Sequence, residues 1–149
     1  MPDTYTDLLY HAVFSTKNRY RFITPAIEQR LFPYVGGIIR QHKGKLLEIN
    51  GTQDHIHILT TFHPTSSVSE MLRVIKSESS RWINSSVKRL RKFGWQDGYA
   101  AFTVSESASD RVRRYIQNQK QHHRLIGFRE EFERLLQRHG LEFAPPRDG

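Results

Sequence analysis

The sequence predicts an α+β domain in which an antiparallel sheet carries its helices mainly on one face. Two periodicities alternate along the chain: short runs rich in β-branched and aromatic residues, and longer stretches with apolar residues at helical spacing. They predict the order strand, helix, strand, strand, helix, strand, helix, followed by one more helix. The length of 149 residues suits a single domain, and the proline-containing residues 144–149 predict a loose tail.

The first half of the chain predicts a strand, a helix and a hairpin. Residues 7–16 are apolar and aromatic, as expected of a strand. Thr24–Pro25 is typical of an N-cap followed by the first helical residue, and apolar side chains then recur at helical spacing. Pro33 is expected to weaken this helix, with a kink as one outcome. Residues 44–62 contain two extended runs, and the turn-like pair Asn50–Gly51 predicts the hairpin turn between them.

The second half predicts one strand among three helices. A capping box at Ser67 and Glu70 precedes a helix with one apolar stripe. Residues 98–106 are expected to form the fourth strand. A similar cap at Ser107 opens the helix "SDRVRRYIQNQKQHH", and the segment "FREEFERLLQRHGLEF" predicts a final amphipathic helix that stops at Gly140.

The charge of the chain indicates a nucleic-acid partner. The formal net charge is +8 and the pI is about 10.0, a surplus of Lys and Arg that suits phosphate backbones. The longest apolar runs are too short to cross a bilayer, and the N-terminus lacks the pattern of an export signal. The absence of cysteine excludes disulfides, thiolate metal sites and cysteine nucleophiles. We therefore expect a cytoplasmic protein that binds nucleic acid and has no membrane partner.

The stretch "QDHIHIL", residues 53–59, places His55 and His57 one residue apart in an apolar run. Because alternate side chains of a strand share a face, both imidazoles are expected on one side, with Ile56 and Ile58 directed into the core. Two imidazoles on one strand can reach a single metal ion. The alternative is a pair of half-exposed histidines bonded to backbone or water, and the pair alone does not decide.

A tyrosine and a glutamine on a later helix form a second group. Tyr115 and Gln119 are four residues apart and are expected to share one helix face. Each alone is more typical of an ordinary amphipathic helix, and only their combination with the histidine pair indicates a catalytic site. His123 could orient a metal, contact DNA or cap the helix end as a cation, and the role of His11 is equally open.

Three basic segments are candidates for a DNA-binding surface. Single-stranded nucleic acid is commonly held by a cationic groove with aromatic rings on which bases stack. The candidates are Lys17, Arg19, Arg21, Arg73, Lys76, Lys88, Arg89, Arg91, Lys92, Phe93 and Trp95. The alternative is that Phe93 and Trp95 anchor a loop to the core while the basic side chains around them are solvated.

Several motifs resemble the single-tyrosine HUH transposases of small bacterial insertion sequences, a family named for two histidines flanking a hydrophobic residue. "DHIHIL" resembles the metal-binding strand of that family. The likeness continues in the family's order through "YHAVFSTKNR", "GGIIRQHKGKLLEINGTQDHIHIL", "IKSESSRWIN", "FGWQDGYAAFTVSES" and "YIQNQKQHHR". It covers roughly residues 5–143.

The resemblance implies a ferredoxin-like or RRM-like sheet, with the tyrosine-bearing helix near the face opposite the other helices. It implies a DNA transposase in which Tyr115 is the nucleophile and His55, His57 and Gln119 hold a divalent ion. We expect Mg²⁺ or Mn²⁺, although imidazoles also suit Zn²⁺.

The resemblance also implies how DNA is cut and joined. Cleavage of single-stranded DNA would leave a 5′-phosphotyrosine and a free 3′-OH, and a second 3′-OH would later reverse the step. The implied substrates are hairpin-bearing element ends. The implied assembly is a homodimer in which Tyr115 acts within one subunit or, in some members, across two.

Three other functions remain open from the sequence. Another HUH endonuclease, such as a replication initiator or a host-adopted relative that processes repeats, would share the chemistry but not strand transfer between element ends. A non-enzymatic nucleic-acid-binding module would need only the sheet and the positive charge. A small-molecule metalloenzyme would leave the net charge of +8 unexplained.

Overall fold

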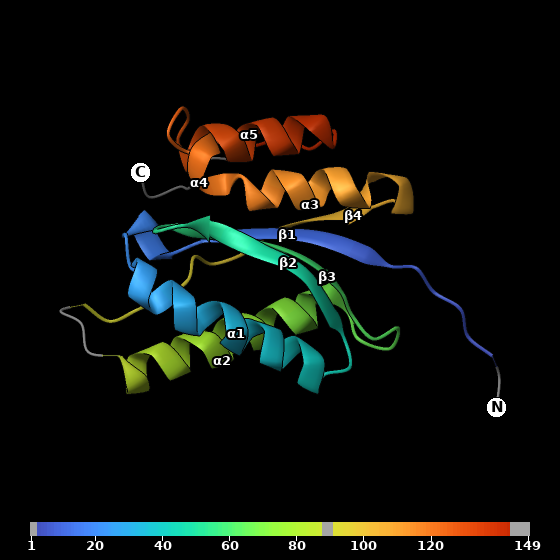
Figure 1. Cartoon of the computed structure of the whole chain (residues 1–149), viewed down its shortest axis with the longest axis horizontal. Coiled ribbons are helices and arrows are strands. Elements are labelled where there is room, and N and C mark those ends of the chain that lie inside the picture. The colour runs from blue at the N-terminus through green and yellow to red at the C-terminus, as the bar shows by residue number, and fades with distance from the viewer. Residues whose placement is uncertain (1–2, 88–90, 144–149) are drawn as a thin grey trace.

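The computed structural model describes residues 3–87 and 91–143, and in this part of the chain a four-stranded sheet lies at the centre of the molecule (Figure 1). The strands lie in the order β2-β3-β1-β4, and each neighbouring pair is antiparallel. The predicted tail at residues 144–149 lies outside the described residues. In chain order the elements are β1 (Leu9–Ser15), η1 (Lys17–Arg19), α1 (Pro25–Gln41), β2 (Lys45–Thr52), β3 (His55–Thr61), α2 (Val68–Ser86), β4 (Ala100–Val104), η2 (Glu106–Ala108), α3 (Ser109–Gln117), α4 (Gln119–His122) and α5 (Phe128–Arg138).

Different helices cover the two faces of the sheet. α1 and α2 lie on one face, whereas α3, α4 and α5 lie on the other (Figure 1). This α+β arrangement, with the tyrosine-bearing helix on the face opposite α1 and α2, confirms the predicted fold, and α4 and α5 share the face of the tyrosine helix. Among the described residues, no helix is both long enough and apolar enough to span a membrane.

The face toward α1 and α2 carries the larger apolar core. Ala12 and Phe14 of β1 and Ile56 and Ile58 of β3 are fully buried there. Burying one large aliphatic side chain stabilises a fold by about 1.5–3 kcal/mol. The helix residues that pack against these strands recur at helical spacing and include Leu31, Val35, Ile39, Leu72, Ile75 and Ile83.

The hairpin between β2 and β3 turns later than predicted. Its turn residues are Gln53 and Asp54, and Gly51 lies inside β2 opposite Ile56. A Cβ atom on residue 51 would lie 2.1 Å from the carbonyl oxygen of His55. Gly51 therefore serves a close approach of two backbones rather than the turn, which is why the Asn50–Gly51 pair predicted the wrong position.

The helix starts agree with the sequence in two cases and differ in one. Thr24 and Ser67 cap α1 and α2, each accepting a hydrogen bond from a backbone N–H three residues on. Ser107 does not cap α3, because it already lies within the helical turn η2. α1 also continues through Pro33 as one helix.

Candidate active site

The two histidines of β3 are buried on the sheet face opposite the larger core. His55 and His57 are both 0% exposed, while Ile56 and Ile58 point toward α1 and α2. The predicted shared face of the imidazoles is confirmed, and the alternative of two half-exposed histidines is wrong. Buried imidazoles need partners for their nitrogen atoms, because an unpaired buried polar group is costly.

Neighbouring residues hold the Nδ1 atoms of both histidines. His55 Nδ1 donates to Asp54 Oδ1 at 2.8 Å, and Thr52 Oγ1 lies 3.0 Å from the same nitrogen. His57 Nδ1 lies 2.8 Å from Nε2 of His11, the buried histidine of β1. Such contacts fix the ring orientation and leave both Nε2 atoms directed toward α4 and α5. His11, whose role the sequence left open, thus lies directly behind His57.

Tyr115 and Gln119 reach the histidines from two helices rather than one. α3 ends before Asn118, whose backbone angles are φ −94° and ψ 14°, and α4 begins after it. The expectation of one continuous helix face was wrong, yet both side chains still meet at the site. Gln119 Oε1 lies 2.9 Å from His55 Nε2, and the rings of Tyr115 and His57 are 5.8 Å apart.

A buried carboxylate on α5, Glu131, connects these side chains. Its Oε2 accepts hydrogen bonds from the Tyr115 hydroxyl and, at 2.7 Å, from Gln119 Nε2. Its Oε1 lies 3.0 Å from His57 Nε2 and 2.9 Å from His123 Nε2. Glu131 is 1% exposed, so one carboxylate joins the proposed nucleophile to three of the site's other side chains in a dry environment.

Glu131 was not among the sequence-based site residues, and the role of His123 was left open. Glu131 is one of several acids in the amphipathic sequence "FREEFERLLQR", where an acid is usually solvated. Its spacing from Phe128 and Leu135 places it on the apolar stripe, and this was the available signal. His123 donates from Nδ1 to the Ile126 carbonyl at 2.9 Å, which turns its Nε2 toward Glu131.

Burial and mutual contact set the charges of the site. Burial alone would raise the pKa of Glu131, but hydrogen bonds from His123, His57 and Tyr115 hold it well below its usual range, so the carboxylate is ionised. Burial, followed by the nearby Glu131 charge, raises the pKa of Tyr115 well above its usual value. Burial lowers the pKa of His57 to about 4 despite the opposing effect of Glu131, so its imidazole is neutral at pH 7.

The donor atoms of this site fit a divalent cation. When His55 Nδ1–H donates to Asp54, the neutral ring presents a lone pair at Nε2, and Gln119 Oε1 presents another at 2.9 Å. Two acceptors this close repel each other unless a cation or an added proton lies near both. Adjacent ligands of an octahedral ion with bonds of about 2.1 Å lie about 3 Å apart. The residues whose ligand atoms all lie within 4.8 Å of one another are His55, His57, His123 and Glu131.

Two of the predicted basic segments lie side by side at the end of the sheet where His55 begins β3. The Lys17 backbone N–H donates to the Gly94 carbonyl at 2.8 Å, and the Arg91 guanidinium lies over the Tyr20 ring at 4.1 Å. We call this the basic end surface, and its exposed cations are Lys17, Arg19, Arg21, Arg91 and Lys92. Lys88 and Arg89 lie outside the described residues.

Phe93 and Trp95 do not contribute exposed rings to this surface. They are 2% and 8% exposed, their rings pack against each other, and Trp95 Nε1 donates to Ser79 Oγ at 2.9 Å. Of the two readings that the sequence left open, the structure supports the alternative, in which both rings anchor the loop to the core. Tyr20, which is 39% exposed, is an aromatic ring open to solvent there.

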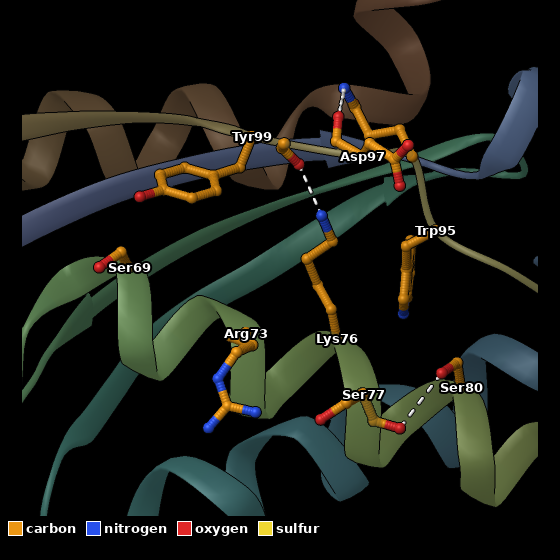
Figure 2. Close-up of a pocket in the computed structure, with 10 residues that line it drawn as sticks. Ser69, Arg73, Lys76, Ser77, Ser80, Trp95, Asp97 and Tyr99 are labelled. Atoms are coloured by element: carbon orange, nitrogen blue, oxygen red, sulfur yellow. Dashed lines mark hydrogen bonds between the residues drawn. The ribbon is translucent and has the colours of Figure 1, made fainter.

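Arg73 and Lys76 lie on α2, on the opposite side of the sheet from the histidines (Figure 1). Figure 2 shows both residues beside a cleft of about 410 Å³ between α2 and residues 95–99. Lys76 Nζ donates to the Gly98 carbonyl at 2.6 Å, and Arg73 pairs with Glu70 at 2.5 Å. Both cations therefore lie on α2, away from the histidine face, and each has a protein partner.

Sequence comparison connects this site to known proteins. The family described as "Transposase IS200 like" matches residues 4–119. The ISDra2 transposase TnpA of Deinococcus radiodurans is 23% identical over 117 residues, which are 75% of this chain and 84% of the relative.

Two solved structures share the fold. A crystal structure of a Deinococcus radiodurans R1 protein assigned as a transposase has a TM-score of 0.63 and 23% identity, covering 80% of this chain and 96% of that one. A REP-associated tyrosine transposase bound to a REP hairpin has a TM-score of 0.62 and 15% identity, and the match covers 83% of this chain and 74% of that one. The family match spans the histidine pair, Tyr115 and Gln119, and ends before His123 and Glu131. On these grounds the chain belongs to the IS200-like transposase family.

Proposed function

We propose that this transposase cuts and rejoins single-stranded DNA through a covalent bond between Tyr115 and a 5′-phosphate, with the help of a divalent cation. One observation carries the proposal: a tyrosine hydroxyl, two imidazoles, an amide oxygen and a carboxylate converge on one buried site within a single chain. Such a gathering of polar groups is typical of a functional site and not of a core.

In the proposed step, Tyr115 Oη attacks the scissile phosphorus. The new O–P bond forms as the bond from phosphorus to the 3′ oxygen breaks; the phenol loses one proton and the leaving oxygen gains one as a free 3′-OH. The energy of the phosphodiester is kept in the phosphotyrosine. A second 3′-OH then attacks the same phosphorus, joins the strands and returns the proton to Tyr115.

The phenol must be activated for this attack. With a pKa near 10, only about one phenol in a thousand is ionised at pH 7, a shortfall of about 4 kcal/mol. Burial and Glu131 raise the pKa of Tyr115 further. Because its own pKa is low, Glu131 is a weak base that orients the hydroxyl rather than removing its proton. A bound divalent cation would supply the remaining activation by polarising the phosphate and stabilising negative charge on oxygen.

His55, His57 and Gln119 are the proposed metal ligands. Asp54 and His11 hold the two rings from behind, so their Nε2 atoms are already oriented for a cation. His123 and Glu131 lie within reach of the same point. The amide and carboxylate oxygens favour Mg²⁺ or Mn²⁺ over softer ions.

Single-stranded DNA with hairpins near the element ends is the proposed substrate. The basic end surface adjoins β3 at His55, so a strand held there by its phosphates could pass directly into the site. A transposase of similar fold has been solved with a REP hairpin. The proposed assembly is a homodimer in which each Tyr115 serves the histidines of its own chain, as its bond to Glu131 within one chain supports.

A covalent-adduct assay tests the proposed function. Wild-type protein is incubated with single-stranded oligonucleotides that span the DNA flanking its gene, with Mg²⁺ or Mn²⁺ or with a chelator, and denatured before electrophoresis. We expect an adduct that needs the cation and is lost in Tyr115→Phe. Tyr99→Phe, on the opposite side of the sheet, is the matched control and retains the adduct. Adduct formation by Tyr115→Phe would overturn the assignment.

A further inference from the structure

We propose that Asn50 is a positioning residue that sets Tyr115 and Gln119 against the histidine pair. The inference rests on the proposed function of Tyr115, and it concerns a strand that carries neither the nucleophile nor a proposed ligand. It starts from the break at Asn118, which separates the two active-site helices. Because no continuous helix links Tyr115 to Gln119, we expect contacts from elsewhere in the fold to help fix their relative positions.

Asn50 lies directly beside the site. It pairs with His57 across the β2–β3 ladder, and opposite residues of such a ladder share a sheet face. The register of β2 shifts between Leu46 and Glu48, where Leu47 is the extra residue. This bulge sets the phase of the strand that follows, so the side chain of Asn50 faces the tyrosine helix.

The amide group of Asn50 holds the end of α3. Its Nδ2 donates to the carbonyl oxygens of Ile116 and Gln117, each at 3.0 Å. These carbonyls belong to the last residues of α3, where a helix leaves its carbonyl groups without intrahelical partners. They immediately follow Tyr115, so the amide fixes the backbone that carries the nucleophile.

The amide oxygen of Asn50 holds α4. Lys120 Nζ donates to Asn50 Oδ1 at 2.7 Å and to the Gly51 carbonyl at 3.3 Å, and it pairs with Glu28 of α1 at 2.8 Å. Lys120 follows Gln119 directly. The two ends of one side chain thus tie both sides of the break to the strand next to His57.

Glu48 provides a comparison on the same strand. It accepts from Arg113 Nε at 3.2 Å and from Gln117 Nε2 at 2.9 Å, so it also connects β2 to α3. Its contacts are with the side chains of Arg113 and Gln117 and do not involve the backbone next to Tyr115. Glu48→Ala therefore removes a tie of similar location without touching the break.

Asn50→Asp is the sharpest change at this position. It keeps the size of the side chain but replaces two donors with a carboxylate facing two carbonyl oxygens. A misplacement of about 1 Å in a reacting group can cost about 100-fold in rate. We expect the single-turnover rate of adduct formation at saturating DNA to fall at least ~10-fold, while the DNA dissociation constant stays within about threefold.

The experiment measures this rate, the DNA dissociation constant and amide hydrogen exchange of residues 115–120 in wild type, Asn50→Asp and Glu48→Ala. Exchange in that segment is expected to rise in Asn50→Asp alone. A purely structural role would instead lower stability and DNA binding with the rate. Equal rates and equal exchange in the two variants would overturn the inference.

Lys120 supplies the second variant, because its exposed side chain can be changed without burying a new group. Lys120→Met is expected to slow adduct formation less than Asn50→Asp, and Lys120→Arg to restore it by keeping a donor. If Asn50→Asp does not fold, Lys120→Met decides the question. A Lys120→Met protein with the adduct rate and the hydrogen exchange of wild type would then contradict the inference. If wild type forms no adduct, the proposed function fails, and hydrogen exchange still decides the positioning role.

Discussion

Neighbouring residues of β3 face opposite sides of the sheet and meet very different surroundings. Ile56 and Ile58 contact apolar side chains of α1 and α2, whereas His55 and His57 contact a glutamine and a glutamate from α4 and α5. All four side chains are 0% exposed. Burial alone therefore does not distinguish the two faces, and the difference lies in what each face must satisfy.

The apolar face needs only close packing, but every nitrogen and oxygen atom on the polar face needs a partner. A buried polar group without one costs about 1–3 kcal/mol. Here the contacts are concentrated on a single carboxylate, Glu131, which serves Tyr115, Gln119, His57 and His123. Aliphatic residues on both faces would be enough to stabilise a buried sheet. The polar residues on one face therefore indicate a functional role.

His57→Ala should produce the largest loss on the polar face. We expect the rate of Tyr115 adduct formation to fall by about 10²–10³-fold, as for other lost electrostatic contacts at a reacting centre. The measurement is single-turnover adduct formation in Mn²⁺, with Ile58→Val as a control on the apolar face. If the variant keeps more than about a tenth of the wild-type rate, the cation is bound at another position.

A mixture of inactive subunits tests whether the polar face is complete within one chain. Tyr115→Phe and His57→Ala proteins are co-expressed and the adduct is measured. Each subunit then lacks one part of its own site, so cleavage should stay at background. Restored cleavage would show that Tyr115 acts on the histidines of a partner and would contradict the single-chain site.

Ile58→Ala should act on stability alone. Truncating a buried isoleucine costs about 2–5 kcal/mol in the free energy of unfolding. Urea unfolding followed by circular dichroism measures this loss. Below the unfolding transition the adduct rate per folded molecule should match wild type, and a rate that falls with stability would argue against separate roles for the two faces.

Acid should reduce the contribution of the polar face to the free energy of unfolding and leave the contribution of the apolar face unchanged. The unfolded chain protonates a histidine near pH 6.5, whereas folded His57 stays neutral to about pH 4, so the unfolded state binds more protons between these values. Stability should therefore fall as the pH drops from 6.5 to 4, by up to about 3 kcal/mol. Glu131, with its lowered pKa, adds a loss below its usual range, whereas the stabilisation from the raised pKa of His123 is already complete at pH 6.5 and stays constant below it.

Urea unfolding in a chelator at pH 7 and pH 4.5 measures this dependence. Ile58→Ala should show the same difference between the two pH values as wild type, because its loss is apolar. A pH-independent free energy of unfolding in wild type would mean that His57 of the folded protein is not held neutral.

The basic end surface should give the smallest effects. Removing one phosphate contact weakens DNA binding several-fold and reduces the salt slope by about one unit. We expect this of Lys17→Ala and Arg91→Ala in fluorescence anisotropy with single-stranded DNA. Arg73→Ala, on α2 and on the opposite side of the sheet from the histidines, is the matched control. An equal loss of DNA affinity in this variant would indicate that DNA also contacts α2.

The sequence predicted the parts of this fold that depend on local patterns. Strand alternation placed His55 and His57 on one face, and helical spacing with good caps located α1 and α2. Gly51 was misread because its role depends on a backbone that approaches from the paired strand.

The other omissions have the same long-range origin. Glu131 enters the site only because α5 packs its stripe on the sheet, a contact that no local pattern specifies. The break at Asn118 was missed because Asn50, on β2, supports it from outside the two helices. The sequence could not decide between base stacking and core anchoring for Phe93 and Trp95, because ring partners such as Phe22 and Phe14 are distant in sequence.

We propose that the polar face of the sheet holds Tyr115 as a nucleophile that a divalent cation assists. The most direct test of this proposal is to map the DNA adduct by proteolysis and tandem mass spectrometry, with Mn²⁺ and with a chelator. We expect a nucleotide mass on the peptide containing Tyr115, formed only with the cation. An adduct on another residue, or one that forms equally in chelator, would contradict it.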